Sequence, residues 1–275
     1  MKKVRNVFWV ECKKVILKGS FPIFAIAVVL MCLFIPIFTD DGSVTNYFAV
    51  LFTVSVEEFA MSDSLRLTSV MGNVISGYFT MFAPMIVSLV ILPVLCEEKE
   101  SGMVRYILPR CGKKAAVIGD FLASVVSGGL VIVAGYLLFF IITATHSYFD
   151  MGIDGILMGE QEIQQMIINI IGVWSYGMIC AVWTYLVSIF LRNRYLLACI
   201  PYIFLYLLDR MINSISYEAL EENLPKRWFV QSFGVGYLFI DFRYMFRIAM
   251  VYVVMSILII LLHLFVLQRR TDCGQ

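Results

Sequence analysis

The segment LCEEKESGMVRYILPRCGKK, residues 95–114, carries eight charged side chains and lies between two long charge-free stretches. The stretch before it, 74–95, and the stretch after it, 121–145, contain no Asp, Glu, Lys or Arg. An α-helix needs about 20 apolar residues to cross the roughly 30 Å hydrocarbon core of a bilayer. Both stretches are long enough, so the sequence predicts two membrane spans joined by this charged loop.

The same pattern extends over the whole chain, which is 61% hydrophobic and 15% charged. Soluble domains carry about 25% charged residues. Further stretches without Asp, Glu, Lys or Arg lie at 21–38, 166–191, 195–208 and 248–267. Of these, 195–208 is short for a span, and we expect its helix to continue past Asp209 and Arg210. The predicted fold is an all-α membrane protein, a single transmembrane domain over 1–275. Its six transmembrane helices are predicted at about 21–38, 74–95, 121–145, 166–191, 195–212 and 248–267.

The distribution of charge predicts the orientation of these spans. If the N-terminus is cytoplasmic, the inner segments hold 15 of the 21 Lys and Arg, and the outer segments hold 14 of the 20 Asp and Glu. Basic residues resist translocation and therefore mark the cytoplasmic side. We expect both termini inside, and the net charge of +1 gives no indication of nucleic-acid binding.

The residues before the first span have the pattern of an amphipathic helix. Val4, Phe8, Cys12 and Val15 share one helical face, although Glu11 interrupts it. We predict a short helix at the inner membrane interface, with a plain basic anchor as the alternative. LFIPIFTDDG, at 33–42, offers no small-x-small cleavage site, which favours an uncleaved first span over a signal peptide.

Motifs for catalysis, metal binding or a bound cofactor are missing. The two histidines, His146 and His263, are far apart, the seven cysteines form no C-x-x-C, and no phosphate-binding loop or G-x-S-x-G is present. We expect His263 to be a hydrogen-bonded residue of the bundle. Glu221-Glu222 is similar to the paired glutamates of intramembrane proteases, but the partner histidines are missing. The sequence predicts a chain without a catalytic or metal site and without its own cofactor.

The charged loop itself can form a helix over 97–109. Three glutamates, Glu97, Glu98 and Glu100, fall in its first turn, where the helix dipole favours negative charge, and Pro109 marks its end. Met103, Val104, Ile107 and Leu108 make an apolar stripe. Such a helix can seat in a groove of a partner protein. The alternative is a solvated loop whose charge merely sets the topology.

The order of residues in EEKESGMVRYILPRCGKKA resembles the cytoplasmic loop of ABC type-2 exporter permeases. In that family an acidic E-x-E-x-G run leads into a basic residue, two aliphatic residues, a proline and a second basic residue. The matching positions here are Glu98, Glu100, Gly102, Arg105, Ile107, Leu108, Pro109 and Arg110. The sequence departs from the family at Asp120, where a lysine is frequent, and in the long acidic segment 39–73.

The resemblance implies that this loop is a coupling helix docking on a separate ATPase subunit. ATP and Mg would then bind to that partner chain, and a second permease chain would complete a dimer in the bacterial cytoplasmic membrane. It also implies short, partly apolar helices in the outer loop 213–247. The predicted coupling residues are Glu97, Glu98, Glu100, Gly102, Met103, Arg105, Ile107, Leu108, Pro109 and Arg110; those of the interfacial helix are Val4, Phe8 and Val15.

The nature of the cargo is less constrained. The longer spans carry no fixed charge, and the chain is rich in Met, Phe and Tyr, with 15, 22 and 14 of them. This composition favours an amphipathic or lipophilic cargo, such as a peptide, an antibiotic or a lipid-like molecule. An acidic outer surface also suits cationic peptides, as in immunity to bacteriocins. The alternatives are a secondary transporter or channel without ATP coupling, and a membrane enzyme or scaffold.

Overall fold

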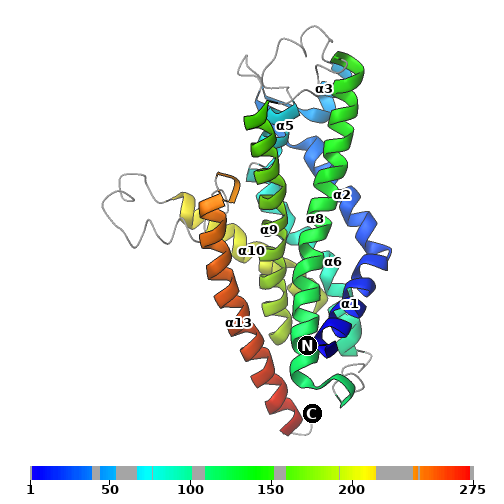
Figure 1. The fold of residues 1–275 in the computed structure, drawn as a ribbon, viewed down its shortest axis with the longest axis vertical. Coiled ribbons are helices and arrows are strands. Elements are labelled where there is room, and N and C mark those ends of the chain that lie inside the picture. Colours follow the sequence, from blue (N-terminus) through cyan, green and yellow to red (C-terminus); the bar gives the residue numbers. More distant parts are fainter. Residues whose placement is uncertain are drawn as a thin grey trace, which may run out of the picture.

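The protein, in a computed structural model, is an elongated bundle of helices (Figure 1). The structure describes residues 2–38, 44–53, 67–75, 77–100, 109–151, 159–191, 193–214, 238–240 and 242–272. Its helices are α1 (Lys2–Leu17), α2 (Ser20–Phe34), α3 (Tyr47–Thr53), α5 (Leu67–Val74), α6 (Gly77–Glu100), α8 (Lys113–Met151), α9 (Glu160–Phe190), α10 (Arg194–Asn213) and α13 (Phe242–Asp272). Strands β1 (Pro36–Phe38) and β2 (Val44–Asn46) pair antiparallel.

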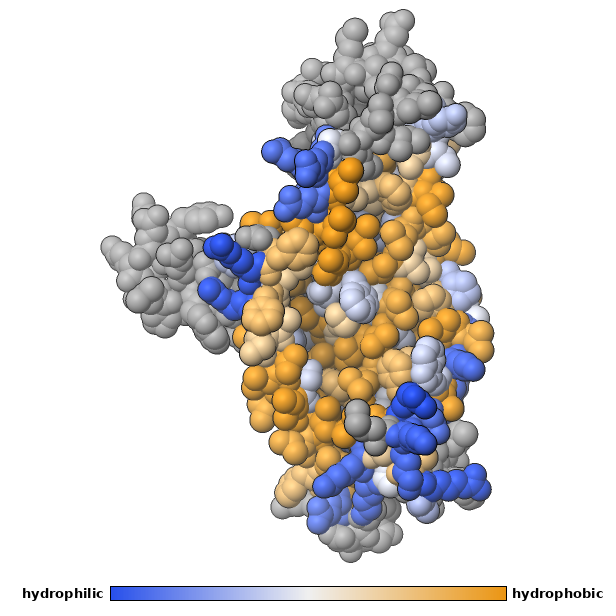
Figure 2. All heavy atoms as spheres, in the orientation of Figure 1, coloured by the Kyte–Doolittle hydropathy of each residue, from blue (hydrophilic) through white to orange (hydrophobic). Residues whose placement is uncertain are grey.

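Several of these helices are long and apolar enough to cross a membrane, which makes the chain a multi-pass membrane protein. Within the described residues five helices qualify, and α1 with α2 forms a further pair that is bent by 61°. Figure 2 shows the apolar surface that these helices present, with hydrophilic residues gathered near its ends and at the start of α13. The five are Phe79–Glu97, Lys113–Tyr148, Glu160–Phe190, Tyr195–Ile212 and Phe242–Gln268.

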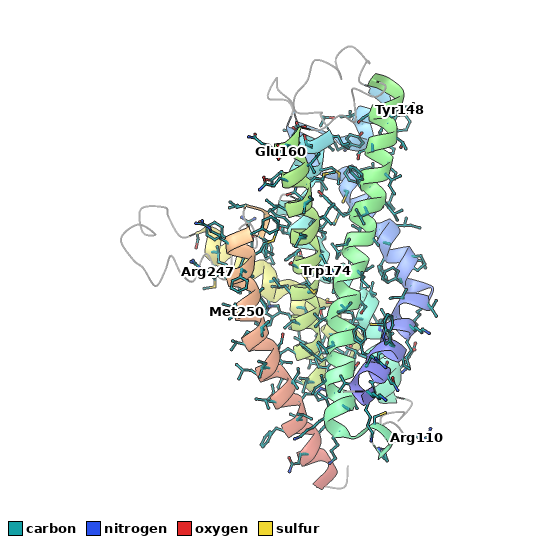
Figure 3. All side chains as sticks on the ribbon, in the orientation of Figure 1. Arg110, Tyr148, Glu160, Trp174, Arg247 and Met250 are labelled. Atoms are coloured by element: carbon teal, nitrogen blue, oxygen red, sulfur yellow. The ribbon has the colours of Figure 1, made fainter. Side chains whose placement is uncertain are left out.

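Both termini lie at one end of the bundle, which we call the terminal end (Figure 1). Arg110 lies at this end, whereas Tyr148 and Glu160 mark the far end (Figure 3). Arg247, near the start of α13, lies at about the height of Trp174 in the same view. The far ends of α8 and α9 therefore project beyond the start of α13. With 39 residues, or roughly 58 Å, α8 is also longer than a bilayer core.

The first predicted span is shorter as a helix than expected. Helix α2 ends at Phe34, and 36–38, predicted as its last turn, form strand β1. The reason is Pro36, which disfavours the helical conformation of the residue before it. Ile35 is accordingly extended, with φ −64° and ψ 134°.

The last predicted span begins earlier than expected. Helix α13 starts at Phe242, so the final residues of the predicted outer loop 213–247 belong to it. Within 215–241 the structure describes only 238–240, a single turn in which Leu238 is buried. A Cβ atom on Gly172 of α9 would lie 2.6 Å from the Phe239 ring, and the Gln165 amide donates a hydrogen bond to the Phe239 carbonyl at 3.1 Å.

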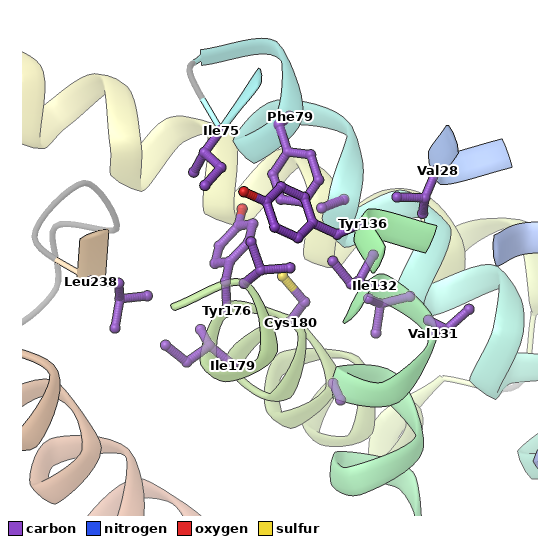
Figure 4. Packing of buried hydrophobic residues seen from close by; sticks show 14 of the residues in the cluster. Val28, Ile75, Phe79, Val131, Ile132, Tyr136, Tyr176, Ile179, Cys180 and Leu238 are labelled. Atoms are coloured by element: carbon purple, nitrogen blue, oxygen red, sulfur yellow. The ribbon is translucent and has the colours of Figure 1, made fainter. Parts of the chain in front are cut away.

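Two buried tyrosines satisfy backbone carbonyls that lack a helical donor. Pro84 lies inside α6 and has no N–H, which frees the carbonyl of Thr80 one turn earlier. The Tyr176 hydroxyl of α9 donates to that carbonyl at 2.5 Å. At the end of α5, the Tyr136 hydroxyl of α8 donates to the Met71 carbonyl at 3.0 Å. Both rings lie in the apolar core (Figure 4), so these bonds fix neighbouring helices where water is excluded.

Helices α8 and α9 approach closely through small residues, which let the backbones of two membrane helices come together. A Cβ atom on Gly177 would lie 2.8 Å from both the Gly128 carbonyl oxygen and the Gly129 Cα. One turn further along α9, a Cβ atom on Gly128 would lie 2.7 Å from the Cβ of Ala181. Larger side chains at these positions would force the two backbones apart.

Candidate functional site

The expected coupling segment begins at the terminal end of α6. Residues 97–100 form the last turn of α6, so no separate helix starts at Glu97. Helical residues reach Cys111, two residues beyond the predicted stop at Pro109, and end at Gly112, whose φ of +86° suits glycine. Gly102, Met103, Arg105, Ile107 and Leu108 lie outside the described residues, as do the side chains of Glu98 and Glu100.

Of the predicted coupling residues with described side chains, Glu97, Pro109 and Arg110 are all exposed. Glu97 forms an ion pair with Lys18, whose Nζ lies 2.5 Å from its Oε1. An exposed ion pair of this kind contributes only about 0–1 kcal/mol to stability, so we note it for the two elements that it joins. It connects the terminal end of α6 to the bend between α1 and α2.

The predicted interfacial helix forms as α1. Val15 is buried and Val4 and Phe8 are half-buried, as the predicted apolar face requires. Its buried side also includes Val7 and Glu11. The Glu11 carboxylate, which interrupts the stripe in the sequence, accepts a hydrogen bond from Lys14 Nζ at 2.7 Å, one turn later on the helix.

Helix α1 packs against the first turns of α8. A Cβ atom on Gly119 would lie 2.7 Å from Cγ1 of Val7, so only glycine permits this contact. Further along, the Cys12 thiol approaches the Ala123 carbonyl with a sulfur–oxygen distance of 4.0 Å. The crossing lies where the charged start of α8 gives way to the charge-free stretch 121–145.

A polar network joins three helices nearby. The Tyr185 hydroxyl of α9 donates to Oδ2 of Asp120 in α8 at 3.1 Å and lies 2.9 Å from Nδ1 of His263 in α13. A phenol has one proton to donate, so a Tyr185 that donates to Asp120 must accept from His263. In that case Nδ1–H of His263 donates to the Tyr185 oxygen, and the Tyr185 hydroxyl donates to the Asp120 carboxylate.

The sequence identified only parts of this network. The expectation that His263 is hydrogen-bonded within the bundle is confirmed. Asp120 stood out as a departure from the family pattern, while Tyr185, fully buried beside Phe121, was one tyrosine among many. A charged residue at the boundary of an apolar stretch and a lone histidine in a span are the signals that could have paired them.

The described residues contain no group of three or more His, Cys, Asp and Glu side chains able to hold a metal ion. Their cysteines are free thiols: Cys12, Cys32, Cys96, Cys111, Cys180 and Cys199. Comparisons of the chain with protein-family models, with curated proteins and with solved structures find no match.

Proposed function

We propose that this chain is the permease subunit of an ATP-driven ABC exporter in a bacterial cytoplasmic membrane, with an ATPase subunit docked on 97–110. The observation that carries the proposal is the residue order E-x-E-x-G, R-x-I-L, P-R in the segment that joins α6 to α8. Arg110 and both chain termini lie at this same end of the bundle (Figures 1 and 3). In this proposal the terminal end is cytoplasmic, α2 supplies the sixth span, and α1 lies at the inner interface.

Energy for transport comes from the partner in this mechanism. Because the chain has no phosphate-binding loop, ATP and Mg²⁺ bind to the ATPase subunit, and two permease chains pair around the cargo pathway. Closure of the ATPases displaces 97–110. Since α6 is helical through Glu100, that displacement moves α6 along its length, and the Lys18–Glu97 ion pair transmits it to the bend of α1 and α2.

An aromatic stack on α6 and α10 supports an amphipathic cargo. The rings of Phe82 and Tyr202 are stacked with centroids 6.4 Å apart, and Tyr202 and Tyr206 repeat this arrangement at 6.4 Å. The Arg210 guanidinium lies over the Tyr206 ring, 5.4 Å from its centroid. Such a row offers flat apolar faces with polar edges, a combination that suits peptides, antibiotics or lipid-like molecules.

The test is co-purification from the native host. We expect the tagged chain to bring a stoichiometric ATP-binding subunit, and the triple substitution Glu97→Lys, Glu98→Lys and Glu100→Lys to lose it while still inserting into the membrane. A matched control carries Asp40→Lys, Asp41→Lys and Glu160→Lys, at positions placed outside by the proposed topology, and should retain the subunit. A chain that purifies alone, or a triple variant that keeps its ATPase, would contradict the proposal.

A second candidate function, proton-coupled secondary transport, is favoured by the Asp120–Tyr185–His263 network. Ionisable groups within a membrane bundle commonly mark proton pathways, and these three come from three different helices. The purified chain in proteoliposomes with an internal pH-sensitive dye distinguishes the two. Proton flux without ATP that disappears in Asp120→Asn would support the second candidate, whereas absence of flux supports the exporter.

A further inference from the structure

The outward side of α1 combines positive charge with large apolar side chains. Lys2, Lys3, Arg5 and Lys13 are exposed on this helix. On the same helix Trp9 is 58% exposed and Leu17 is 79% exposed. The helix has one acidic residue, Glu11, which is buried and paired with Lys14. The exposed surface of α1 therefore carries basic and apolar side chains, with Asn6 as a neutral polar residue and no acidic one.

The packing of α1 determines its depth relative to the membrane. Val7 contacts Gly119 and Cys12 approaches Ala123, on either side of Asp120, the last charged residue before the charge-free stretch 121–145. The other end of α1 is held level with the terminal end of α6 by the Lys18–Glu97 ion pair. Helix α1 is therefore packed where the charged start of α8 gives way to the apolar stretch 121–145.

Further basic residues continue this surface onto α8. Arg110, Lys113 and Lys114 are exposed at the start of α8, the helix against which α1 packs. Figure 2 shows hydrophilic side chains gathered at this end of the molecule, next to the apolar surface of the spans. Phosphate groups of lipids attract such clusters, because each basic side chain near an anionic surface strengthens binding roughly fivefold.

We propose that α1 and the start of α8 bind the headgroups of anionic phospholipids. Lys2, Lys3, Arg5 and Lys13 contact the phosphates, while Trp9 and Leu17 insert between the acyl chains. A zwitterionic lipid offers no net charge to this surface. A soluble acidic protein would match the charge but would leave the large apolar side chains without an apolar partner at headgroup depth. The proposal needs only a membrane-spanning chain and does not rest on ATP coupling.

Trp9 provides a direct probe. The chain has four tryptophans, and replacing Trp174, Trp183 and Trp228 by Phe leaves Trp9 as the only reporter. This variant is reconstituted in vesicles that contain equal amounts of phosphatidylglycerol and phosphatidylcholine, with bromine on the acyl chains of one lipid at a time. We expect brominated phosphatidylglycerol to quench Trp9 more strongly, corresponding to a relative affinity on the order of tenfold. Phospholipid analysis of the unmodified chain after partial delipidation should show the same selectivity.

Control variants test whether the lipid selectivity comes from the basic residues of α1 or from positive charge anywhere on the protein. Replacing Lys2, Lys3, Arg5 and Lys13 by Gln should lower the selectivity severalfold, leaving only the contribution of the basic residues at the start of α8. Replacing Arg243 and Arg247, exposed at the start of α13, by Gln should leave it unchanged. Equal quenching by the two lipids in the parent variant, with no enrichment on the unmodified chain, overturns the proposal. So does a four-Gln variant that keeps its lipid selectivity but loses a co-purifying ATPase, because the surface is then a protein-docking site.

Discussion

Replacing Tyr176 by Phe should destabilise the bundle because it removes one hydroxyl without changing the packing of the ring. Pro84 cannot donate to the Thr80 carbonyl, and the Tyr176 hydroxyl donates to it at 2.5 Å from the neighbouring helix. Tyr176 is fully buried, so water cannot replace the lost donor. Hydrogen bonds between membrane helices contribute about 0.6 kcal/mol on average and up to about 1.7. A buried polar group left without its partner costs about 1–3 kcal/mol. We expect a cost of about 1–2 kcal/mol.

A second substitution, at Pro84 itself, should cancel the destabilisation caused by Tyr176→Phe. Pro84→Ala restores a backbone N–H that can reach the Thr80 carbonyl within α6, one helical turn away. Tyr176→Phe should then cost little in the Pro84→Ala background, giving a coupling free energy of about 1–2 kcal/mol. Pro93→Ala, a matched change elsewhere in the same helix, should leave the full cost of Tyr176→Phe in place.

Equilibrium unfolding in mixed micelles of a mild detergent and dodecyl sulfate, followed by far-UV circular dichroism, measures these differences. A cost of 1–2 kcal/mol corresponds to a roughly 5- to 30-fold change in the unfolding equilibrium constant. Tyr176→Phe is compared in three backgrounds: wild type, Pro84→Ala and Pro93→Ala. Equal costs in all three would refute the inference that Tyr176 compensates for the proline.

Two other predictions concern the packing of the helices, and a third concerns the proposed topology. Gly177→Ala should lower stability by about 1–3 kcal/mol more than Gly72→Ala. A Cβ atom on Gly177 would lie 2.8 Å from backbone atoms of α8, whereas nothing lies within 4 Å of a Cβ atom on Gly72. Equal unfolding midpoints of the two variants would contradict the close approach of α8 and α9. Tyr185→Phe and Asp120→Ala should each lower stability by about 1 kcal/mol, and the double variant by less than their sum, because both remove the same hydrogen bond. Additive costs in the unfolding assay would exclude the network. With Cys111 as the sole cysteine, a membrane-impermeant maleimide should label inside-out vesicles but not intact cells, and the reverse pattern would invert the proposed topology.

The sequence was sufficient for the helical class and for the approximate position of most spans. Charge-free stretches of 20 residues or more are a local property, and the helices that contain 77–95, 121–145, 166–190 and 248–267 meet the length and hydropathy expected of spans. The stretch 195–208 also lies in a helix of sufficient length, which continues to Asn213. Local chemistry likewise explains the end of α2, because Pro36 was visible in the sequence even though its effect on Ile35 was not anticipated.

Contacts between distant parts of the chain depended on the tertiary structure. Asp120, Tyr185 and His263 are separated by 65 and 78 residues, and only the packing of α8, α9 and α13 brings them into one network. The Lys18–Glu97 ion pair likewise spans 79 residues. Hydropathy reports how each segment partitions between water and lipid, which is a property of the segment alone. Which face of a helix meets which neighbour depends on the shapes and hydrogen-bonding groups of several helices together, and therefore only the folded bundle decides it.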